Sequence, residues 1–374
     1  MKEGWEYKKL GDLCQVLDSQ RKPVTKKDRT KGIYPYYGAT GIQDYVDSYI
    51  FDGRFLLVGE DGAKWGATDK TAYIIEGKSW VNNHAHILKV LENLNDRLLE
   101  YYLTFKDLSE YITGAVVPKL TQKALVSIPI PVPPLSEQQH IVEELDLLSS
   151  IIEKKKAQLN ELDNLAQSLF YEMFGDPITN EKGWEMKKMD EVCNVTSSKR
   201  IFANEYCGHG VPFYRGKEIT EKSKGQEISV ELYISTERYE EIKKEYGIPI
   251  KGDILITAVG TIGNIWVVND DEPFYFKDGN IIWLKDIKSI DSVYFKTILS
   301  LLIAAYKQQM VQGCAYNALT IVNLKKMFFA LPPQKSQQQF ASKIESIEHQ
   351  KELIKQSIKE VETLFNSRMD FYFN

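Results

Sequence analysis

The sequence predicts an α+β protein in which two similar globular domains are separated by two long helices, which pair as an antiparallel intramolecular coiled coil with a pseudo-twofold axis. Three observations support this prediction. The opening segment GWEYKKLGDLCQV at residues 4–16 returns as GWEMKKMDEVCNV at residues 183–195. A second segment, PKLTQKALVSIPIPVPP at residues 118–134, returns as NALTIVNLKKMFFALPP at residues 317–333. Each copy continues into a long stretch with heptad spacing, which indicates a tandem repeat.

The first domain is expected over residues 1–135. Its runs FLLVGE, TAYIIE and AHILKV are short and apolar, and they are separated by Gly, Asp and Asn turns. This pattern is typical of β-strands. The run NDRLLEYYLTF is the best candidate for a helix. We therefore expect a strand-rich domain with few helices.

The first long helix is expected over residues 136–175. Ser136 and Gln139 have the S-x-x-Q form of a capping box directly after Pro133 and Pro134, which predicts the start of a helix. Heptad steps then place apolar residues on one seam, which Lys155 interrupts. The seam residues are Ile141, Leu145, Leu148, Ile152, Leu159 and Leu162.

The second domain is expected over residues 176–333, where DILITA, NIWVVN and NIIWLK resemble strands and VYFKTILSLLIAAYKQQM resembles a helix. The second long helix is expected over residues 334–374, and Lys351 interrupts its seam. The seam residues are Ile344, Ile347, Ile354, Ile358 and Val361. The two seam lysines either fix the register of the helix pair or extend their ammonium groups to solvent. A helix of about 38 residues spans about 57 Å, so pairing within the chain is the economical arrangement.

Composition restricts the class of protein. The chain has 374 residues, of which 43% are hydrophobic, and this length and composition suit two or three domains with hydrophobic cores. Its formal net charge is −5. No run approaches the ~18 apolar residues of a membrane span, and the polar opening MKEGWEYKKLGD is unlike a signal peptide. We therefore expect a cytoplasmic protein without membrane contact. Cys14 and Cys193 occupy matching positions of the repeat, which favours small buried core residues.

The sequence lacks the motifs of ATP-dependent and methyl-transferring enzymes. It contains no G-x-x-x-x-G-K-[ST] phosphate loop and no Asn/Asp-Pro-Pro-Tyr/Phe tetrapeptide of the kind that amino-methyltransferases place against a flipped base. His84 and His86 alternate along a predicted strand, but no third metal ligand stands at a suitable spacing. We expect no catalytic residue, no metal site and no cofactor in this chain.

Turns rich in Lys, Arg, Asn and aromatic residues connect the predicted strands of both domains. Lys and Arg neutralise phosphates, Arg reads guanine and Asn reads adenine. Each turn alone is also typical of a solvated loop, but two such sets on related domains favour double-stranded DNA as a partner. In the first domain the candidate contacts are Arg21, Lys22, Tyr36, Tyr37, Lys64, Trp65, Asn83 and Lys119. In the second they are Lys199, Arg200, Tyr214, Arg215, Lys217, Asn264, Lys277 and Asn317.

The order of these segments resembles the specificity subunit of type I restriction-modification systems. The resemblance lies in SIPIPVPPLSEQQHIV at residues 127–142, KLTQKAL at residues 119–125, GEDGAKWG at residues 59–66 and VNNHAHIL at residues 81–88. It covers essentially the whole chain. The second copy departs from it at residues 334–337, where Gln-Lys-Ser-Gln replaces the usual Leu-Ser-Glu pattern, and this makes the start of the second helix less well defined.

The resemblance implies a prokaryotic protein that supplies an address for other subunits. Each domain would be a target recognition domain for one half of a split, asymmetric DNA sequence, and the helix pair would be a spacer and a dock. Two methylation subunits would carry S-adenosylmethionine and methylate adenine N6, and restriction subunits would add cleavage that depends on ATP and Mg²⁺. A helix pair lying along the duplex would span at most about 16 base pairs. The isolated chain is expected to be monomeric or weakly self-associating.

Two other functions are weighed against this one. A two-headed coiled-coil scaffold for protein partners, without sequence-specific DNA binding, fits the aromatic-rich loops and the negative net charge. A self-contained methyltransferase or nuclease is disfavoured because the cofactor and metal motifs are missing. Sequence-dependent DNA binding distinguishes the scaffold, and binding of S-adenosylmethionine by the isolated chain distinguishes the enzyme.

Overall fold

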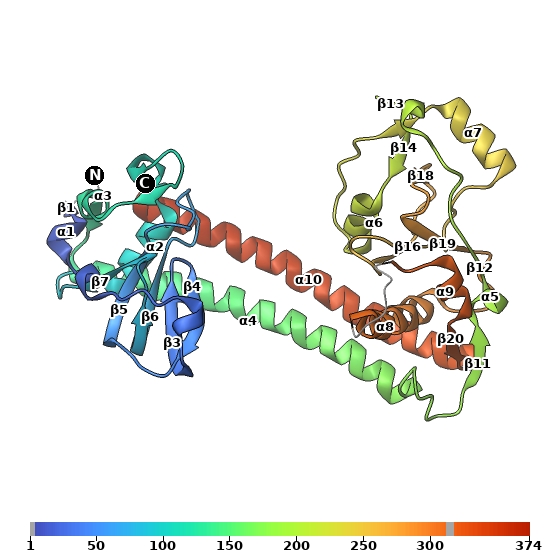
Figure 1. The fold of residues 1–374 in the computed structure, drawn as a ribbon, viewed down its shortest axis with the longest axis horizontal. Helices are drawn as coiled ribbons and strands as arrows, with labels where there is room; N and C mark the ends of the chain where they lie inside the picture. Colours follow the sequence, from blue (N-terminus) through green and yellow to red (C-terminus); the bar gives the residue numbers. More distant parts are fainter. Residues whose placement is uncertain (1–3, 312–317) are drawn as a thin grey trace. The chain divides into compact units, whose positions relative to one another are not determined.

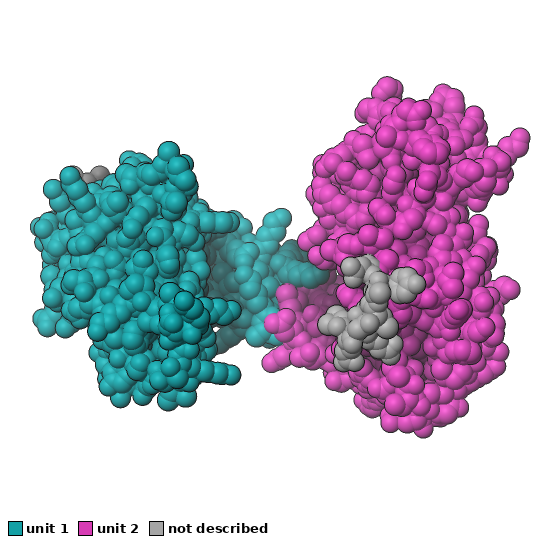
Figure 2. All heavy atoms as spheres, in the orientation of Figure 1, with its two compact units in different colours: residues 1–158, 354–374 teal, residues 159–353 magenta. Residues whose placement is uncertain are grey.

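The computed structural model describes residues 4–311 and 318–374, with the backbone alone for residues 309–311. The chain divides into two compact units, which Figure 2 shows in different colours. Unit 1 contains residues Met1–Gln158 and Ile354–Asn374, and unit 2 contains residues Leu159–Leu353. Each unit therefore combines one strand-rich segment with parts of both long helices.

Unit 1 is built on a six-stranded sheet with the strand order β2-β7-β5-β6-β3-β4, and Figure 1 shows β7, β5 and β6 side by side. Its strands are β2 (Cys14–Val16), β3 (Lys31–Gly38), β4 (Gly41–Val46), β5 (Phe51–Gly59), β6 (Ala72–Val81) and β7 (Ala85–Val90). All neighbours are antiparallel except β3 and β6. Both faces of β5 are covered, because Leu56 and Val58 pack into one apolar cluster and Leu57 packs into another. This alternation follows the two-residue period of a strand.

Smaller elements close unit 1 around this sheet. They are β1 (Glu6–Lys9), α1 (Leu10–Leu13), α2 (Asp96–Phe105), β8 (Ile112–Thr113), β9 (Lys119–Leu120), α3 (Gln122–Ser127) and β10 (Pro129–Val132), with 3₁₀ turns at Asp18–Gln20, Lys26–Asp28 and Ser109–Tyr111. β1 and β10 form an antiparallel pair. The start of the chain is thereby held beside the strand that leads into the first long helix.

Unit 2 repeats the frame of unit 1. Its elements are β11 (Glu185–Lys188), α5 (Met189–Val192), β12 (Asn194–Thr196), β16 (Ile254–Thr257), β17 (Ile265–Val267), β19 (Ile281–Lys285), α8 (Ser292–Val311), α9 (Ile321–Lys326) and β20 (Phe328–Leu331). β11 pairs with β20 as β1 pairs with β10, and β12-β19-β16-β17 form a four-stranded sheet. The repeated segments of the sequence thus become repeated elements of the fold.

The middle of unit 2 carries a second four-stranded sheet with the order β13-β15-β14-β18. Its elements are a 3₁₀ turn (Ala203–Glu205), β13 (Tyr206–Cys207), β14 (Val211–Tyr214), α6 (Gly216–Ser223), β15 (Tyr233–Ile234), α7 (Thr236–Glu245) and β18 (Tyr275–Phe276). Phe213, Ile234 and Ile242 are among the buried residues of its own apolar cluster. The frame of unit 2 therefore contains, between β12 and β19, a second folded sheet with its own small core.

Two uninterrupted helices of 40 residues each, α4 (Leu135–Phe174) and α10 (Gln334–Phe373), confirm the prediction of long helices. α4 begins before Ser136, because the carbonyl of Pro134 accepts the amide hydrogens of Glu137 and Gln138. The predicted capping box is wrong for this reason: Ser136 lies inside the first turn. Pro333 plays the same part for α10.

The predicted seam is shielded from solvent on both helices. Ile141, Leu145, Leu148, Ile347 and Ile358 are buried, and Ile152, Leu159, Leu162, Ile344, Ile354 and Val361 are half-buried. In unit 1 the ends of the helices meet through Arg368, whose Nη2 donates to Glu144 Oε2 at 2.8 Å. In unit 2 the ring of Phe170 lies 5.7 Å from the ring of Phe340. The seam is therefore part of the packed core at each end.

The two seam lysines differ in their surroundings. The Lys351 side chain is only 14% exposed, and its Nζ lies 2.7 Å from Asp163 Oδ1 and 2.8 Å from Glu348 Oε1. Burial lowers the pKa of Lys351, but hydrogen bonds with these two carboxylates outweigh that effect and hold the pKa above its ordinary value. Lys351 therefore pairs across the helices within unit 2, whereas Lys155 is half-buried.

A buried glutamine fastens the start of each long helix to the neighbouring domain. Gln138 Oε1 accepts the amide hydrogen of Asn95 at 2.7 Å, and Gln337 Oε1 accepts that of Asp291 at 2.9 Å. Each glutamine also donates to a proline carbonyl five residues before it. The backbone amides of Asn95 and Asp291 directly precede α2 and α8, so the same polar contact recurs in both repeats.

No helix within residues 4–311 and 318–374 combines the length and the low polarity that crossing a bilayer requires.

Candidate nucleic-acid interface

Glu60, which follows β5, joins several of the segments that the sequence predicts to contact DNA. Its side chain is 9% exposed and accepts from Arg21 Nη1 at 2.5 Å and from Lys119 Nζ at 2.7 Å. Its backbone amide donates to the carbonyl of His84 at 2.9 Å, and its carbonyl accepts from the amide of Leu120 at 2.8 Å. One residue therefore fixes the loop after β2, the turn after β5, the start of β7 and strand β9.

Asp18 and His86 extend this network below the surface. Asp18 Oδ2 lies 2.5 Å from His86 Nδ1, and Asp18 Oδ1 accepts the amide hydrogen of Ile87 at 3.0 Å. His86 Nε2 lies 2.7 Å from the carbonyl oxygen of Leu120. We call Asp18, Arg21, Glu60, His86 and Lys119 the Glu60 cluster. Because buried charges require partners, each member has a structural reason to be present.

The Glu60 cluster has the residue types of a metal site, since polar atoms of Asp18, Glu60 and His86 lie within 4.8 Å of one another. The cations of Arg21 and Lys119 already neutralise the two carboxylates. Both ring nitrogens of His86 also face oxygen atoms of the protein. Asp18, Arg21, Glu60, His86 and Lys119 therefore form an ion-pair and hydrogen-bond network in which each charged group has a partner within the chain. The sequence spacing did not predict that Asp18 and Glu60 would lie beside His86.

The predicted contacts of unit 1 fall into three groups. Lys22, Lys64 and Asn83 are exposed, and Arg21, Tyr37 and Lys119 are half-buried. Tyr36 and Trp65 are buried, with 1% and 8% of their surface exposed. The first group can meet a ligand directly, whereas Arg21 and Lys119 are held by the Glu60 cluster.

Tyr36 and Trp65 require a correction, because their side chains belong to the interior. The amide of Val24 donates to Tyr36 Oη at 3.0 Å, and the Arg29 guanidinium lies 4.0 Å from the centre of the Tyr36 ring. Trp65 Nε1 donates to the carbonyl of Gly59 at 3.0 Å while its ring packs into the main apolar cluster of unit 1. Both side chains stabilise the turns that carry the exposed candidates.

In unit 2, Arg215 and Lys217 converge on Glu231. Arg215 Nη2 lies 2.7 Å from Glu231 Oε2 and 2.9 Å from Glu218 Oε1, and Lys217 Nζ lies 2.9 Å from Glu231 Oε1. The hydrogen bonds from Lys217 and Arg215 lower the pKa of Glu231 to about 2. Glu218 and then Glu231 raise the pKa of Arg215 above its usual range. These two cations thus already have anionic partners in the described structure.

Asn264 and Tyr214 are also committed to contacts within unit 2. Asn264 Nδ2 donates to Thr220 Oγ1 at 3.1 Å and to the carbonyl of Thr261 at 2.9 Å. An adenine contact by this amide would have to replace both bonds. Tyr214 is 6% exposed and stacks on Phe274 with ring centres 4.8 Å apart. The prediction that Tyr214 contacts DNA is corrected in favour of a core role.

The remaining candidates of unit 2 lie nearer the surface. Arg200 is exposed while its Nε donates to Asp278 Oδ2 at 2.8 Å, and the exposed Lys199 has its Nζ 4.7 Å from the centre of the Tyr246 ring. Lys277 is half-buried. Asn317 lies outside the described residues. Phe202, which the sequence reasoning did not select, is 60% exposed beside these cations in the chain.

Among the described residues of unit 2, the position that matches Glu60 carries no charged side chain. The amide of Leu120 donates to Glu60, and the amide of Leu319 donates to Ala258 in the matching place. Ala258 therefore occupies the position of Glu60, and Ala318 occupies the position of Lys119. The sequence reasoning selected GEDGAKWG for its lysine and tryptophan and overlooked its glutamate, because an acidic residue does not contact phosphate. One feature of the sequence could have identified Glu60: it is a charged residue at a position where the second repeat has an alanine, Ala258.

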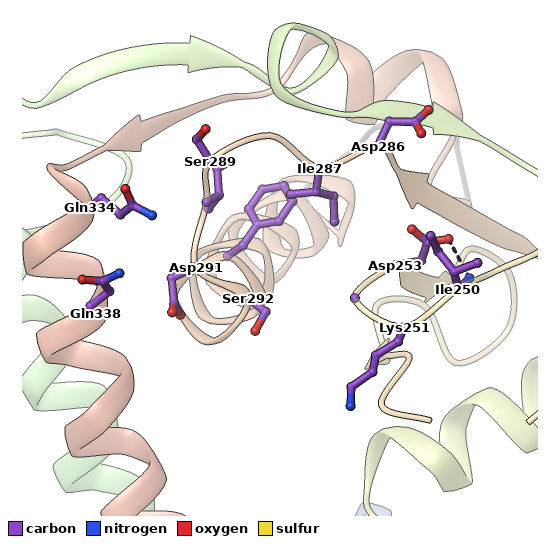
Figure 3. Close-up of a pocket in the computed structure, with 13 residues that line it drawn as sticks. Ile250, Lys251, Asp253, Asp286, Ile287, Ser289, Asp291, Ser292, Gln334 and Gln338 are labelled. Atoms are coloured by element: carbon purple, nitrogen blue, oxygen red, sulfur yellow. Dashed lines mark hydrogen bonds between the residues drawn. The ribbon is translucent and has the colours of Figure 1, made fainter. Parts of the chain in front are cut away.

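Unit 2 also contains a pocket of about 540 Å³, whose lining is mainly polar and acidic (Figure 3). Its lining includes Asp253, Asp286 and Asp291 with one cation, Lys251. Asp253 Oδ2 accepts from Trp283 Nε1 at 2.8 Å, and burial raises the pKa of Asp253. A lining with more carboxylates than cations disfavours contact with phosphate.

Comparison with a family model places these units among known proteins. The model described as "Type I restriction modification DNA specificity domain" matches residues 2–164 and again residues 181–363. Each match covers one strand-rich domain and most of the long helix that follows it. The two matched stretches therefore correspond to the two repeats.

Curated relatives and solved structures agree with this match. A putative type I restriction enzyme specificity subunit from Haemophilus influenzae is 34% identical over 92% of this chain and 87% of its own length. The type I restriction enzyme MjaVIII specificity subunit from Methanocaldococcus jannaschii is 23% identical over 96% and 90%. The type I restriction-modification S subunit from M. genitalium shares the fold, with a TM-score of 0.58, 14% identity and coverage of 98% and 95%. A structure of a type I R-M system reported for complex assembly and conformational transition has a TM-score of 0.58 at 16% identity, covering 100% and 98%.

Proposed function

The chain belongs to the family of type I restriction-modification DNA specificity proteins, and from this premise we propose that its two units each read one half of a bipartite, asymmetric DNA target. Specificity subunits of this family are non-catalytic DNA-recognition components. The chemistry to be explained is therefore recognition of base edges and phosphates, not bond formation.

The observation that carries the proposal for unit 1 is the convergence of predicted contacts on the Glu60 cluster. Arg21 and Lys119 pair with Glu60. Lys64 is exposed in the turn after β5, and Asn83 is exposed in the turn between β6 and β7. Lys64 can neutralise a phosphate, and the amide of Asn83 can read the edge of an adenine. Arg21 is then a positioning residue, because its guanidinium is used by Asp18 and Glu60.

For unit 2 we propose that the second half is met by the exposed residues Lys199, Arg200 and Lys217, with the exposed ring of Phe202 beside them in the chain. Arg200 is 65% exposed although it pairs with Asp278, so its other guanidinium donors can face a ligand. A cation with an exposed fork suits bidentate contact with guanine or phosphate. The two units therefore present different side chains, as an asymmetric target requires.

The helix pair is proposed to run antiparallel and to separate the two reading units. Within unit 1, Glu144 contacts Arg368 and Lys156 contacts Glu362, so residue numbers rise on α4 as they fall on α10. Within unit 2, Asp163 pairs with Lys351 and Phe170 packs against Phe340, which gives the same direction. A helix of 40 residues spans about 60 Å at 1.5 Å per residue. This length would set the upper limit for the gap between the two half-sites.

The outer faces of the long helices are proposed to bind two methylation subunits. Apolar side chains remain exposed there at Leu147 (60%), Leu165 (52%), Leu353 (54%), Leu364 (50%) and Phe371 (57%). A contiguous apolar patch on an exposed face is typical of a partner surface, and we propose that these side chains contribute to one. S-adenosylmethionine would be held by those methylation subunits, and ATP and Mg²⁺ by restriction subunits. This assignment follows from the family resemblance, and the sequence of this chain contains neither a phosphate loop nor the methyltransferase tetrapeptide.

Selection from random duplexes tests the proposal. The chain is purified with its methylation subunits, mixed with a random duplex pool at about 150 mM salt, where nonspecific phosphate binding is weakened, and the retained DNA is sequenced. The proposal predicts enrichment of two short specified halves at a fixed gap. Stable binding of the methylation subunits without any enriched sequence would contradict it and would favour a protein scaffold. Replacing Lys64 and Asn83 by Ala should relax one half and leave the other.

A further inference from the structure

The hairpin formed by β8 and β9 carries an apolar tip that unit 1 does not use in its core. Ile112 and Thr113 pair with Leu120 and Lys119, and residues 114–118 form the turn. All five turn residues are exposed, with 93% of Val116 and 62% of Val117 accessible. Leaving a valine in water forgoes about 1.5 kcal/mol or more of burial free energy. Two adjacent exposed valines at the tip of this hairpin are therefore available to an apolar contact with a partner.

The turn is a defined structure. Gly114 has φ +95°, and a Cβ there would lie 2.3 Å from the carbonyl oxygen of Val117. A residue with a side chain would force the turn to open. The sequence thus selects a tight turn that displays the two valines.

The stem of the hairpin is fastened to the Glu60 cluster. Lys119 pairs with Glu60 through its Nζ, and Asp61 forms a β-bridge with Lys119. The amide of Leu120 donates to Glu60, and the carbonyl of Leu120 faces His86 Nε2. The exposed tip is therefore mounted on a network of ion pairs and hydrogen bonds.

We propose that this tip is an apolar wedge that enters the DNA half-site of unit 1 and unstacks one base step; the inference rests on the proposed function. The turn after β5, which carries the exposed Lys64, is bridged to the hairpin stem at Asp61 and Lys119. Proteins that insert an apolar side chain between base steps also use cations to contact the DNA, and Lys64 is an exposed cation on the turn that is bridged to this hairpin. Methylation of a duplex base requires that the base leave the stack, and a wedge lowers the cost of that step.

The test uses the complex with its methylation subunits and the duplex that random selection enriches. 2-Aminopurine replaces, one at a time, each purine of the unit 1 half except the methylated adenine. The chain with both Val116→Ser and Val117→Ser is compared with Ile33→Ser, a matched control on β3 whose residue is 79% exposed in the same unit. The parent and the control should brighten the probe at one base step. The double variant should lose this signal and bind about tenfold more weakly, within the range for one lost base contact.

Other outcomes reject the wedge in distinguishable ways. Equal brightening by the double variant, or none by the parent, overturns it while leaving sequence selection intact. Weaker binding to duplexes with uracil in place of thymine, without brightening, identifies contact with a thymine methyl group instead. Loss of the methylation subunits from the double variant during gel filtration identifies a protein contact. Failure of the parent to select any sequence is the separate result that removes the proposed function itself.

Discussion

Glu60→Gln is the substitution that most directly probes how unit 1 holds the segments that we propose to face DNA. The change keeps the size of the side chain and one oxygen acceptor, but it removes the charge that pairs with Arg21 at 2.5 Å and with Lys119 at 2.7 Å. Arg21 is only 11% exposed, so its cation would lose a partner in a place that water reaches poorly. The turn after β5 and strand β9 should then open more often.

The expected cost follows from the exposure of the two partners. A hydrogen bond to a charged group contributes about 1.5–3 kcal/mol. The bond to Arg21 falls within that range, although Arg21 retains Asp18 and the carbonyl of Ala85. Lys119 is 42% exposed, so screening reduces its pairing to about 1 kcal/mol or less. The local opening free energy should therefore fall by about 3 kcal/mol.

Hydrogen exchange of the intact complex measures this quantity at named amides. Since 1.4 kcal/mol corresponds to a factor of ten, the amides of Glu60 and Leu120 should exchange roughly 100-fold faster in the variant. Glu76→Gln is the matched control, because this glutamate is 74% exposed and lies 3.4 Å from Arg54; its change should leave both amides within about threefold of the parent. Unchanged exchange at Glu60 and Leu120 in Glu60→Gln would refute the structural role of the cluster.

Three further predictions concern the frame and the second unit. Gln138→Ala removes three hydrogen bonds to main-chain groups from a residue that is 1% exposed; urea unfolding should show a loss of about 2–4 kcal/mol, whereas the exposed Gln139→Ala should cost less than about 0.5 kcal/mol. Ile347→Ala, at a seam position that is 6% exposed, should lower the free energy of unfolding by about 2–4 kcal/mol. Leu353→Ala, at a position that is 54% exposed on the same helix, should change the free energy of unfolding by less than about 0.5 kcal/mol. Equal effects of the two substitutions would reject the predicted seam. The folded-state pKa of Glu231, about 2, lies below the ordinary 4.5; its ion pairs therefore stabilise the fold above pH 4.5 and are lost as the pH falls towards 2. A carboxyl ¹³C titration should place the Glu231 midpoint near pH 2, and a midpoint near 4.5 would contradict the pairing.

The sequence was sufficient for the frame of the protein because the frame is periodic. The repeats of Trp5 and Trp184 and the uninterrupted heptads predicted two related domains and two long helices, which the structure contains. The sequence predicted Ser136 as the N-cap of α4, yet the carbonyl of Pro134 accepts the first amide hydrogens of the helix. The prolines and the heptad spacing thus predicted where the helix lies, but its first residue, Leu135, was known only from the folded structure.

The candidate site was harder to predict because it depends on residues far apart in the chain. Arg21 meets Glu60 across 39 positions, and nothing in the spacing of the loop announces this partner. Aromatic residues in polar turns were predicted to face DNA, but Trp65 is buried, because its ring completes the core under the turn. Residue type indicated the chemistry of the surface, whereas exposure and pairing required the folded chain.

The most direct test of the central claim, that each unit reads one half of a split target, is a single-base map of N6-methyladenine in host DNA. The chain is expressed with its methylation subunit, and the map is compared with that of the chain carrying Lys64→Ala and Asn83→Ala. The account predicts one bipartite motif with a fixed gap for the parent, and relaxed or lost specificity confined to one half for the variant. A parent complex that forms but leaves no such motif, or a variant that alters both halves alike, would contradict it.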